Sequence, residues 1–297
     1  CLRAVVGPIT RGTFRLDAEA ADGRADKAVA IATGPRNGPG HIDVPISVAD
    51  APTRDRNFRR APAAPTQPDN DTLAQARSWL AQAERPFAII GLDAVAEGAG
   101  PALRAFLGAH QIPFVTSYKA KGILPEDHPL CRGGAGLSPL ADSHLLPLAA
   151  QSDLILSLGY DPIEMRPGWR NAWDPTHQRV IEIAAEPNTH YMHQASLNIV
   201  APLTPTLEAL TEKAETAPTR WPGGELSTAQ QALHAAFDPQ DDSWGPAGVI
   251  AECRATLPSE PLATADSGAH RHLPRQLWQR NQPRGARHAS GLCTMGP

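Results

Sequence analysis

A turn at residues 266–270 combines side-chain types that proteins use to hold an anion. Its sequence is Asp-Ser-Gly-Ala-His, and it follows a predicted strand at that strand's carboxyl end. A serine, a small residue and a histidine in a turn that glycine permits can present several donors to an anion. A single histidine is more often structural than catalytic, so this turn on its own does not establish a site.

Three further glycine-containing segments are expected at the carboxyl edge of a sheet, where backbone N–H groups and a helix N-terminus can converge on a phosphate. Residues 91–98 read Gly-Leu-Asp-Ala-Val-Ala-Glu-Gly, which is not the G-x-G-x-x-G fingerprint, and Asp93 and Glu97 would repel a pyrophosphate. An ordinary strand-to-helix turn is therefore favoured there. For residues 133–136 and 159–161, both expected in loops at the carboxyl edge of a sheet, ligand binding and simple turn formation remain open.

Bulk composition excludes several function classes. The 297 residues are 41% hydrophobic and 20% charged, which suits a packed core, and a net charge of −4 without a basic stripe argues against nucleic acid. The longest apolar runs are far shorter than the ~20 residues of a membrane span, and the first residues lack a signal peptide's apolar core. The four cysteines, Cys1, Cys131, Cys253 and Cys293, form no CxxC pair and suit a reducing cytoplasm.

Apolar periodicity predicts the elements that position these segments. Short apolar strands are expected at 87–91, 112–117, 153–159, 179–184 and 197–200. Helices are expected at 71–84, with Asp71 as its cap, and at 99–110, 141–150 and 203–214. This alternation predicts an α/β fold, a doubly wound parallel-sheet (Rossmann-like) central domain at residues 71–214.

Stretches rich in proline and glycine divide the rest of the chain. Residues 51–70 are expected to be a linker, and residues 215–245 a second linker with a helix. Residues 1–50 and 246–297 then form two incomplete α/β pieces that flank the central domain. The first is expected to hold a helix at 26–33 and a strand at 41–47, and the second a helix at 245–258 and a strand at 261–268.

Three stretches, in order along the chain, resemble the thiamine diphosphate-dependent enzymes related to acetolactate synthase. Residues 28–48, AVAIATGPRNGPGHIDVPISV, are similar to the end of that family's pyrimidine-binding domain. Residues 86–213 carry landmarks of its central domain, among them PFAIIG, RGGAG, SDLILSLG and RVIEIAAEP. Residues 263–278, ATADSGAHRHLPRQLW, and 290–296, SGLCTMG, are similar to the start of its pyrophosphate-binding domain.

The resemblance implies a parent enzyme, a lyase or transferase, that decarboxylates 2-keto acids and can join the product to a second carbonyl compound. Thiamine diphosphate would be the electron sink, while the protein supplies orientation and electrostatics. In the family a glutamate activates the cofactor, and a Gly-Asp-Gly motif with a downstream Asn holds Mg²⁺ on the diphosphate. The cofactor lies between two subunits in that family, so a homodimer or homotetramer is expected of the parent.

Five residues match family positions that lie against the cofactor. Gly268, Ala269 and His270 fall where a Gly-Gln-His turn meets the diphosphate, and Ala269 replaces the side-chain amide, which leaves that contact to the backbone. Cys293 and Met295 fall in a segment that usually reads GLGTMG and lies along the aminopyrimidine. The resemblance implies that the methionine helps to bend the cofactor and that Cys293 stands in place of a glycine.

The catalytic glutamate is expected upstream of Cys1 and the Gly-Asp-Gly motif downstream of Pro297, so we expect a fragment, inactive alone, with no catalytic or metal-binding residue. Members that bind FAD often carry an arginine shortly after the third strand's glycine. Here residues 159–166 hold two acids and the arginine is displaced to Arg166, which favours an empty or remodelled pocket over FAD. Two alternatives remain open: a stand-alone nucleotide-binding (ADP or FAD) module without catalysis, and a decayed chain without activity.

Overall fold

The chain divides into two compact units, which are described separately. A computed structural model gives unit 1 as Cys1–Pro65 and unit 2 as Thr66–Pro297. The residues that the structure describes are 2–34, 37–53, 66–188, 191–212, 214, 220–238, 245–258, 261–266, 268 and 272–288. Within these ranges no helix is both long and apolar enough to cross a membrane.

Unit 1 is a small α/β piece built on two parallel strands. Its elements are α1 (Leu2–Val6), η1 (Gly7–Ile9), β1 (Gly12–Arg15), α2 (Ala21–Ala32), β2 (Gly40–Asp43) and α3 (Ile46–Ala49). β1 and β2 pair from Gly12 opposite Gly40 to Arg15 opposite Asp43. The strand expected at 41–47 therefore ends earlier than predicted. Pro45 has no N–H to continue a ladder and instead precedes the short helix α3.

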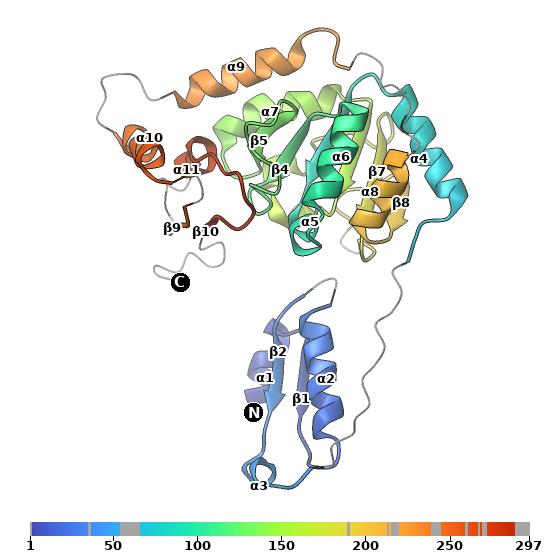
Figure 1. Ribbon diagram of the computed structural model, residues 1–297, viewed down its shortest axis with the longest axis vertical. Helices are drawn as coiled ribbons and strands as arrows, with labels where there is room; N and C mark the ends of the chain where they lie inside the picture. Colours follow the sequence, from blue (N-terminus) through green and yellow to red (C-terminus); the bar gives the residue numbers. More distant parts are fainter. Residues whose placement is uncertain are drawn as a thin grey trace. The chain divides into compact units, whose positions relative to one another are not determined.

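The centre of unit 2 is a six-stranded, wholly parallel sheet, which confirms the predicted doubly wound fold (Figure 1). Its strands are β3 (Pro86–Ile90), β4 (Phe114–Ser117), β5 (Cys131–Ala135), β6 (Leu154–Leu158), β7 (Arg179–Ala184) and β8 (Leu197–Val200). They lie side by side in the order β5-β4-β3-β6-β7-β8. The chain thus runs outward from β3 in one direction and then outward from β6 in the other, so the strand order reverses between β3 and β6.

Helices cover both faces of this sheet. One face packs against α4 (Asn70–Gln82), α5 (Leu92–Ala96), α6 (Gly100–His110) and α8 (Leu203–Glu212). The other face packs against α7 (Pro139–Gln151), η3 (Pro167–Trp169) and α9 (Glu225–Phe237). Strand β3 shows why its run of apolar residues is needed: Phe87 and Ile89 belong to one core and Ala88 and Ile90 to the other, because successive side chains alternate between faces.

Strand β5 corrects one prediction. The glycines at 133–136 were expected in a loop, but Gly133 and Gly134 lie inside β5, the edge strand beside β4. Its register with β4 shifts between Phe114 and Thr116, and Gly133 has a φ of 100°, a backbone conformation that side chains disfavour. Glycine is a poor strand former, so the sequence lacked the apolar or β-branched pattern that marks the other strands.

The cap of α4 corrects a second. The helix begins at Asn70, and its N-cap is Asp69, which accepts a hydrogen bond from the Thr72 backbone N–H at 2.8 Å. Asp71 lies in the first turn instead. An N-cap residue needs extended backbone angles, and Asp69 has them, with φ −67° and ψ 163°.

The C-terminal part of unit 2 holds four further elements. They are α10 (Pro246–Thr256), β9 (Ala263–Ala265), α11 (His272–Leu277) and β10 (Ala286–His288). β9 and β10 pair in parallel, while α11 contacts β5 and α9. Leu273 and Leu277 pack on the core that α7 and α9 share, so α11 is attached to the central domain.

Candidate functional site

The carboxyl ends of β3 and β6 form the place where an open α/β sheet of this strand order binds its ligand. Gly91 follows β3 and Gly159 follows β6, and the two turns touch. The N–H of Gly91 donates to the Leu158 carbonyl at 3.0 Å, and the N–H of Asp93 donates to the Gly159 carbonyl at 3.1 Å. A Cβ on Gly91 would lie 2.3 Å from the Gly159 oxygen and 2.3 Å from the Tyr160 Cα. The turns therefore leave no space between them.

Glu164 lies at the centre of this edge. It ends the short 3-10 helix η2 (Pro162–Glu164), which directly follows the turn after β6. Its two carboxylate oxygens each accept from the Leu92 N–H at 3.0 Å, and Oε1 also accepts from the Asp161 N–H at 3.1 Å. The Ser117 hydroxyl, at the carboxyl end of β4, donates to Oε2. Three segments thus converge on one side chain that is only 2% exposed.

The environment of Glu164 changes its acidity. Burial raises the pKa of the Glu164 carboxyl to about 7, although hydrogen bonds from Ser117, Leu92 and Asp161 oppose that rise. The group therefore exchanges its proton near neutral pH. A carboxyl with such a pKa is a candidate functional residue, and the same values occur in structural networks.

Asp93 and Glu97, the two acids expected to repel a phosphate, lie in the first turn and at the C-cap of α5. β3 ends at Ile90 and α5 begins at Leu92, so residues 91–98 contain a strand-to-helix turn. Glu97 accepts from the Leu203 N–H at 2.7 Å and so caps α8, and burial raises its pKa. Arg166, the displaced arginine, has an exposed side chain, and its backbone N–H donates to the Gly136 carbonyl at 3.0 Å.

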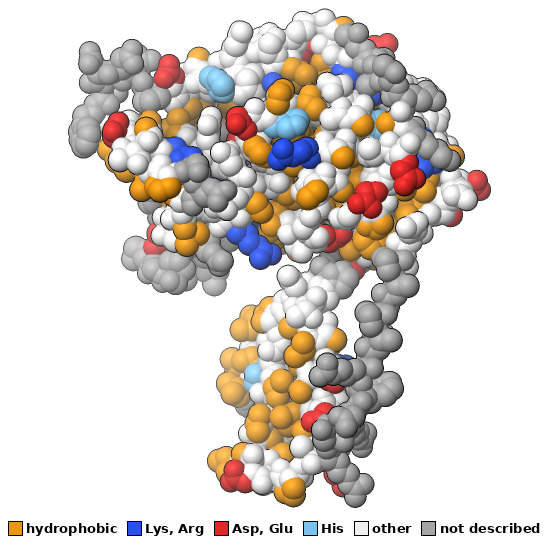
Figure 2. Space-filling view, in the orientation of Figure 1, with side chains coloured by type: hydrophobic (Ala, Val, Ile, Leu, Met, Phe, Trp, Pro, Cys, Tyr) orange, Lys and Arg blue, Asp and Glu red, His pale blue; other side chains and the backbone are white. Residues whose placement is uncertain are grey.

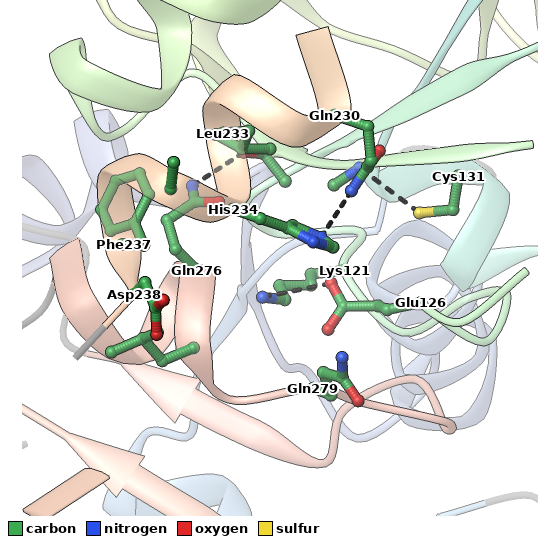
Figure 3. Close-up of a pocket in the computed structure, with 14 residues that line it drawn as sticks. Lys121, Glu126, Cys131, Gln230, Leu233, His234, Phe237, Asp238, Gln276 and Gln279 are labelled. Carbon is green, nitrogen blue, oxygen red and sulfur yellow. Dashed lines mark hydrogen bonds and ion pairs between the residues drawn. The ribbon is translucent and has the colours of Figure 1, made fainter. Parts of the chain in front are cut away.

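A cavity of about 580 Å³ lies beside the edge strand β5 (Figure 3). Its walls come from β5, the loop after β4, α9, α11 and Gln279. The lining residues are Lys121, Glu126, Cys131, Gly133, Gly134, Gln230, Leu233, His234, Ala235, Phe237, Asp238, Gln276, Leu277 and Gln279. Gly133 and Gly134 were singled out for binding or turn formation, and they line this cavity as part of a strand.

Polar side chains around the cavity already contact one another. Lys121 Nζ lies 3.1 Å from Glu126 Oε1, and both side chains are buried. Gln230 and His234, one turn apart on α9, are joined by a 2.8 Å hydrogen bond between side-chain nitrogens. Gln276 of α11 donates to the Gly134 carbonyl at 3.0 Å. The cavity can therefore offer amide, imidazole and charged groups to a small polar molecule, beside the apolar side chains of α9.

Cys131 does not supply a nucleophile to this cavity. Its thiol is buried, and burial raises its pKa to about 12. Because the thiolate is the reactive form, a thiol with this pKa stays protonated and inert at neutral pH.

Most residues of the cavity could not be recognised from the sequence. Lys121 and Glu126 come from the loop after β4, whereas His234 and Gln276 come from α9 and α11. Side chains more than a hundred residues apart have no spacing that could link them. The Gln230–His234 pair, four residues apart on one helix face, is the pattern that could have been found.

The five residues predicted to lie against the cofactor are mostly outside the described ranges. Gly268 is described and is exposed, three residues after β9 ends. Ala269, His270, Cys293 and Met295 lie outside the described residues, so their predicted roles remain predictions. Among the residues that the structure describes, no group of three or more His, Cys, Asp or Glu side chains could hold a metal ion.

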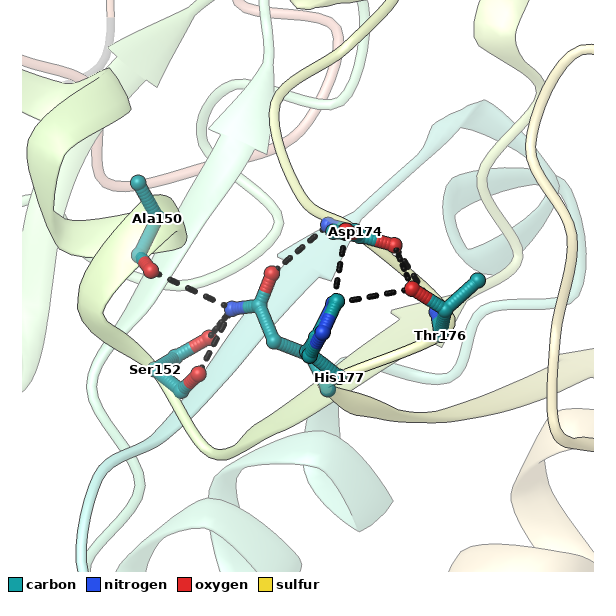
Figure 4. A network of polar contacts seen from close by, with 6 residues as sticks. Ala150, Ser152, Asp174, Thr176 and His177 are labelled. Atoms are coloured by element: carbon teal, nitrogen blue, oxygen red, sulfur yellow. Dashed lines mark hydrogen bonds and ion pairs between the residues drawn. The ribbon is translucent and has the colours of Figure 1, made fainter.

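A polar network at the opposite edge of the sheet has a structural role (Figure 4). His177 Nδ1 lies 2.8 Å from Asp174 Oδ2, and the Thr176 hydroxyl also donates to Asp174 at 2.6 Å. The Gln178 amide donates to carbonyls at the end of α7, including that of Ser152 at 2.6 Å. These residues precede β7 and so lie at the amino edge, away from the ligand edge of the sheet.

Known proteins match this chain in both sequence and structure. The family description "Thiamine pyrophosphate enzyme, central domain" matches residues 73–210. An acetolactate synthase of Bacillus subtilis is 26% identical over 99% of this chain and 52% of its own length. An oxalyl-CoA decarboxylase of Escherichia coli is 31% identical over 48% of this chain and 26% of its own length.

A solved structure has the same fold. It belongs to a Mycobacterium smegmatis protein assigned to the thiamin diphosphate-dependent enzymes, and it aligns with a TM-score of 0.77 and 19% identity over 99% of this chain and 56% of that one. The chain thus spans about half the length of the acetolactate synthase that it matches. Residues 73–210 are therefore a thiamine pyrophosphate enzyme central domain, in a chain whose acetolactate synthase-like homologues match it over nearly its whole length.

Proposed function

We propose that this chain is part of a thiamine diphosphate-dependent enzyme that decarboxylates 2-keto acids and joins the product to a second carbonyl compound. The observation that carries the proposal is the match to acetolactate synthase over 99% of the chain, with the central domain in its middle. The doubly wound sheet of unit 2 supports it, since its strands and helices follow the order expected of that domain.

In this proposal the chain contributes a scaffold and one wall of the cofactor site. Gly268, Ala269 and His270 would lie against the diphosphate, and Cys293 and Met295 along the aminopyrimidine. When bound, thiamine diphosphate would supply the electron sink for loss of CO₂, and these residues would orient it. The 297 residues contain no Gly-Asp-Gly triplet. We therefore expect this chain alone neither to hold Mg²⁺ on the diphosphate nor to turn over 2-keto acids.

The test compares two proteins, the 297-residue chain and the product of the complete reading frame that contains it. Each is incubated with thiamine diphosphate, Mg²⁺ and labelled 2-keto acids, and released CO₂ is counted. We expect CO₂ from the product of the complete frame and only background from the 297-residue chain. No CO₂ release from any 2-keto acid by the complete product would refute the function. Turnover by the 297-residue chain would refute its inactivity.

A stand-alone ADP or FAD module gains no support from the site geometry. The Leu92 N–H, the donor that a phosphate would use at the start of α5, is bonded to Glu164. The residues at this edge therefore do not fit FAD.

The assembly and compartment of the enzyme are further parts of the proposal. We expect the product of the complete reading frame to be a homodimer or homotetramer in the cytoplasm, with 2-keto acids as its substrates. Light scattering with and without the cofactor and Mg²⁺ measures the first expectation. A mass that stays monomeric with the cofactor bound would contradict it.

A further inference from the structure

We propose that Glu164 takes the place of a ligand's anionic group and closes the edge between β3 and β6 of this chain to nucleoside diphosphates and dinucleotides. The proposal concerns the strand-order reversal of the central sheet, and it does not depend on the thiamine diphosphate chemistry proposed above. Glu164 lies outside the cavity of about 580 Å³ described above. It also lies outside a second cavity, of about 210 Å³, beside β7 and β8.

The donors around Glu164 are of the kind that bind phosphates. Where a strand of such a sheet runs into a helix, the first free backbone N–H groups point at the ligand. In this chain the Leu92 N–H holds that position, yet it donates to both oxygens of Glu164 at 3.0 Å. The Asp161 N–H and the Ser117 hydroxyl complete the set. Backbone and side-chain donors from three segments thus hydrogen-bond to the Glu164 carboxylate of the chain itself.

The packing leaves no room for a second anion. A Cβ on Gly91 would lie 2.7 Å from Glu164 Oε1, in addition to its contacts with the turn after β6. A Cβ on Gly159 would lie 2.7 Å from the Ala94 backbone nitrogen in α5. Both glycines are needed because the two turns approach so closely. A pyrophosphate could enter only if these turns separated.

The charge of the edge also opposes an anionic ligand. Glu164 and the neighbouring Asp161 bring two carboxyl groups to the turn after β6. Lys119 acts on Glu164 as the opposite charge, but burial has the larger effect on its carboxyl. A phosphate placed here would meet the Asp161 carboxylate, and the Glu164 carboxylate whenever that group is ionised, at short range in a poorly hydrated site, which is unfavourable.

The first experiment uses the unaltered chain. Calorimetric titration with ADP and with FAD, with flavin fluorescence as a second readout, is expected to give no binding signal. A saturable titration with either nucleotide, lost when the turn after β6 is altered by Tyr160→Ala, would overturn the proposal. This test needs no substitution that could unfold the protein when the outcome is negative.

The second experiment removes the Glu164 carboxylate by substitution and supplies a small carboxylate in solution. Glu164→Ala leaves three donors around an empty space, so its melting temperature is expected to fall. Acetate or formate is then expected to raise that temperature by several degrees more than chloride at the same ionic strength. Ile163→Ala, an exposed neighbour on the same short helix, is the matched control and is expected to respond equally to the three salts.

Adding Ser117→Ala to Glu164→Ala is expected to weaken the rescue, because one of the three donors is lost. Equal responses of Glu164→Ala and Ile163→Ala to acetate would overturn the proposed anion substitution. If Glu164→Ala does not fold, Glu164→Gly and Glu164→Ser are tested with the same salts. Failure of this experiment leaves the CO₂ assay of the proposed function unaffected, so the two proposals can fail separately.

Discussion

Glu164 exchanges its proton near pH 7, and this makes the stability of the folded chain depend on pH. Its pKa in the folded chain, about 7, lies above its ordinary value of 4.5, so the folded state binds the proton more tightly than the unfolded state does. This contribution to stability is complete below pH 4.5 and is lost as the pH rises through 7. The free energy of unfolding should therefore decrease over that range by on the order of 3 kcal/mol.

Glu164→Gln should remove most of this decrease, because the amide has no proton to lose. Urea unfolding at a series of pH values measures it. Glu97 and Asp142 also have carboxyl pKa values that burial raises, so a smaller slope should remain in the variant. Glu208→Gln, at an exposed position of α8, is the control. An unchanged slope in Glu164→Gln would contradict the assignment.

Gly91 should tolerate no side chain. Gly91→Ala places a methyl group 2.3 Å from two backbone atoms of the turn after β6, so the backbone must move. A loss of about 1–3 kcal/mol is expected, as for other overpacked sites, with a lower melting temperature. Gly108→Ala in α6 is the matched control, since nothing lies within 4 Å of its Cβ and alanine favours helix. A melting temperature for Gly91→Ala equal to that of Gly108→Ala would refute the close approach.

At this scale the sequence shows which charged residues follow β6 but not the geometry that they adopt. Two acids and a displaced arginine between 159 and 166 indicated a remodelled pocket. The sequence could not show that Glu164 enters the site while Arg166 remains exposed. That choice depends on the 3-10 turn of η2, which bends the chain back toward α5.

The elements of unit 2 follow from their apolar patterns wherever a strand is buried on both faces. Strands β3, β6 and β7 were predicted because their residues are apolar and belong to two cores. β5 was missed because glycines replace those residues at the sheet edge. β10, with three residues, is shorter than any pattern can identify.

The start of α4 offers a test of a local prediction. Asp69→Ala should lower the free energy of unfolding, because the cap of the Thr72 N–H is lost. Asp71→Ala should lower it less, since Asp71 lies in the first turn, where an acid stabilises the helix through the helix dipole and does not cap it. Chemical denaturation of both variants decides between them. A larger loss of stability for Asp71→Ala than for Asp69→Ala would indicate that Asp71 is the cap.

At the scale of the whole molecule, the two units differ in how much they bury. Among the described residues of unit 1, only Ala28 is buried. Hydrophobic side chains gather on the surface of this unit in Figure 2. The large exposed ones are Leu2, Val5, Ile9, Val29, Ile42, Val44 and Ile46. Two strands and such a small core are marginal in water without further packing.

Hydrogen exchange should show that the amides of the two units differ in protection. In the 297-residue chain, amides of β1 and β2 should exchange much faster than those of β3, β6 and β7, whose strands lie between two cores. Mass spectrometry of peptides from the two units gives the rates. The control is β8, an edge strand of the large sheet, which should show intermediate protection. Equal protection of β1 and β3 would contradict the difference in stability.

The strand order also governs how this domain is completed during synthesis. β3 pairs with β6 from Pro86 opposite Leu154 to Ile90 opposite Leu158, so the centre of the sheet joins segments that the ribosome makes far apart in time. A nascent chain that has released β3, β4 and β5 has one side of the sheet without its neighbour. Only the arrival of β6 covers the open edge of β3 and makes β3 an interior strand of the sheet.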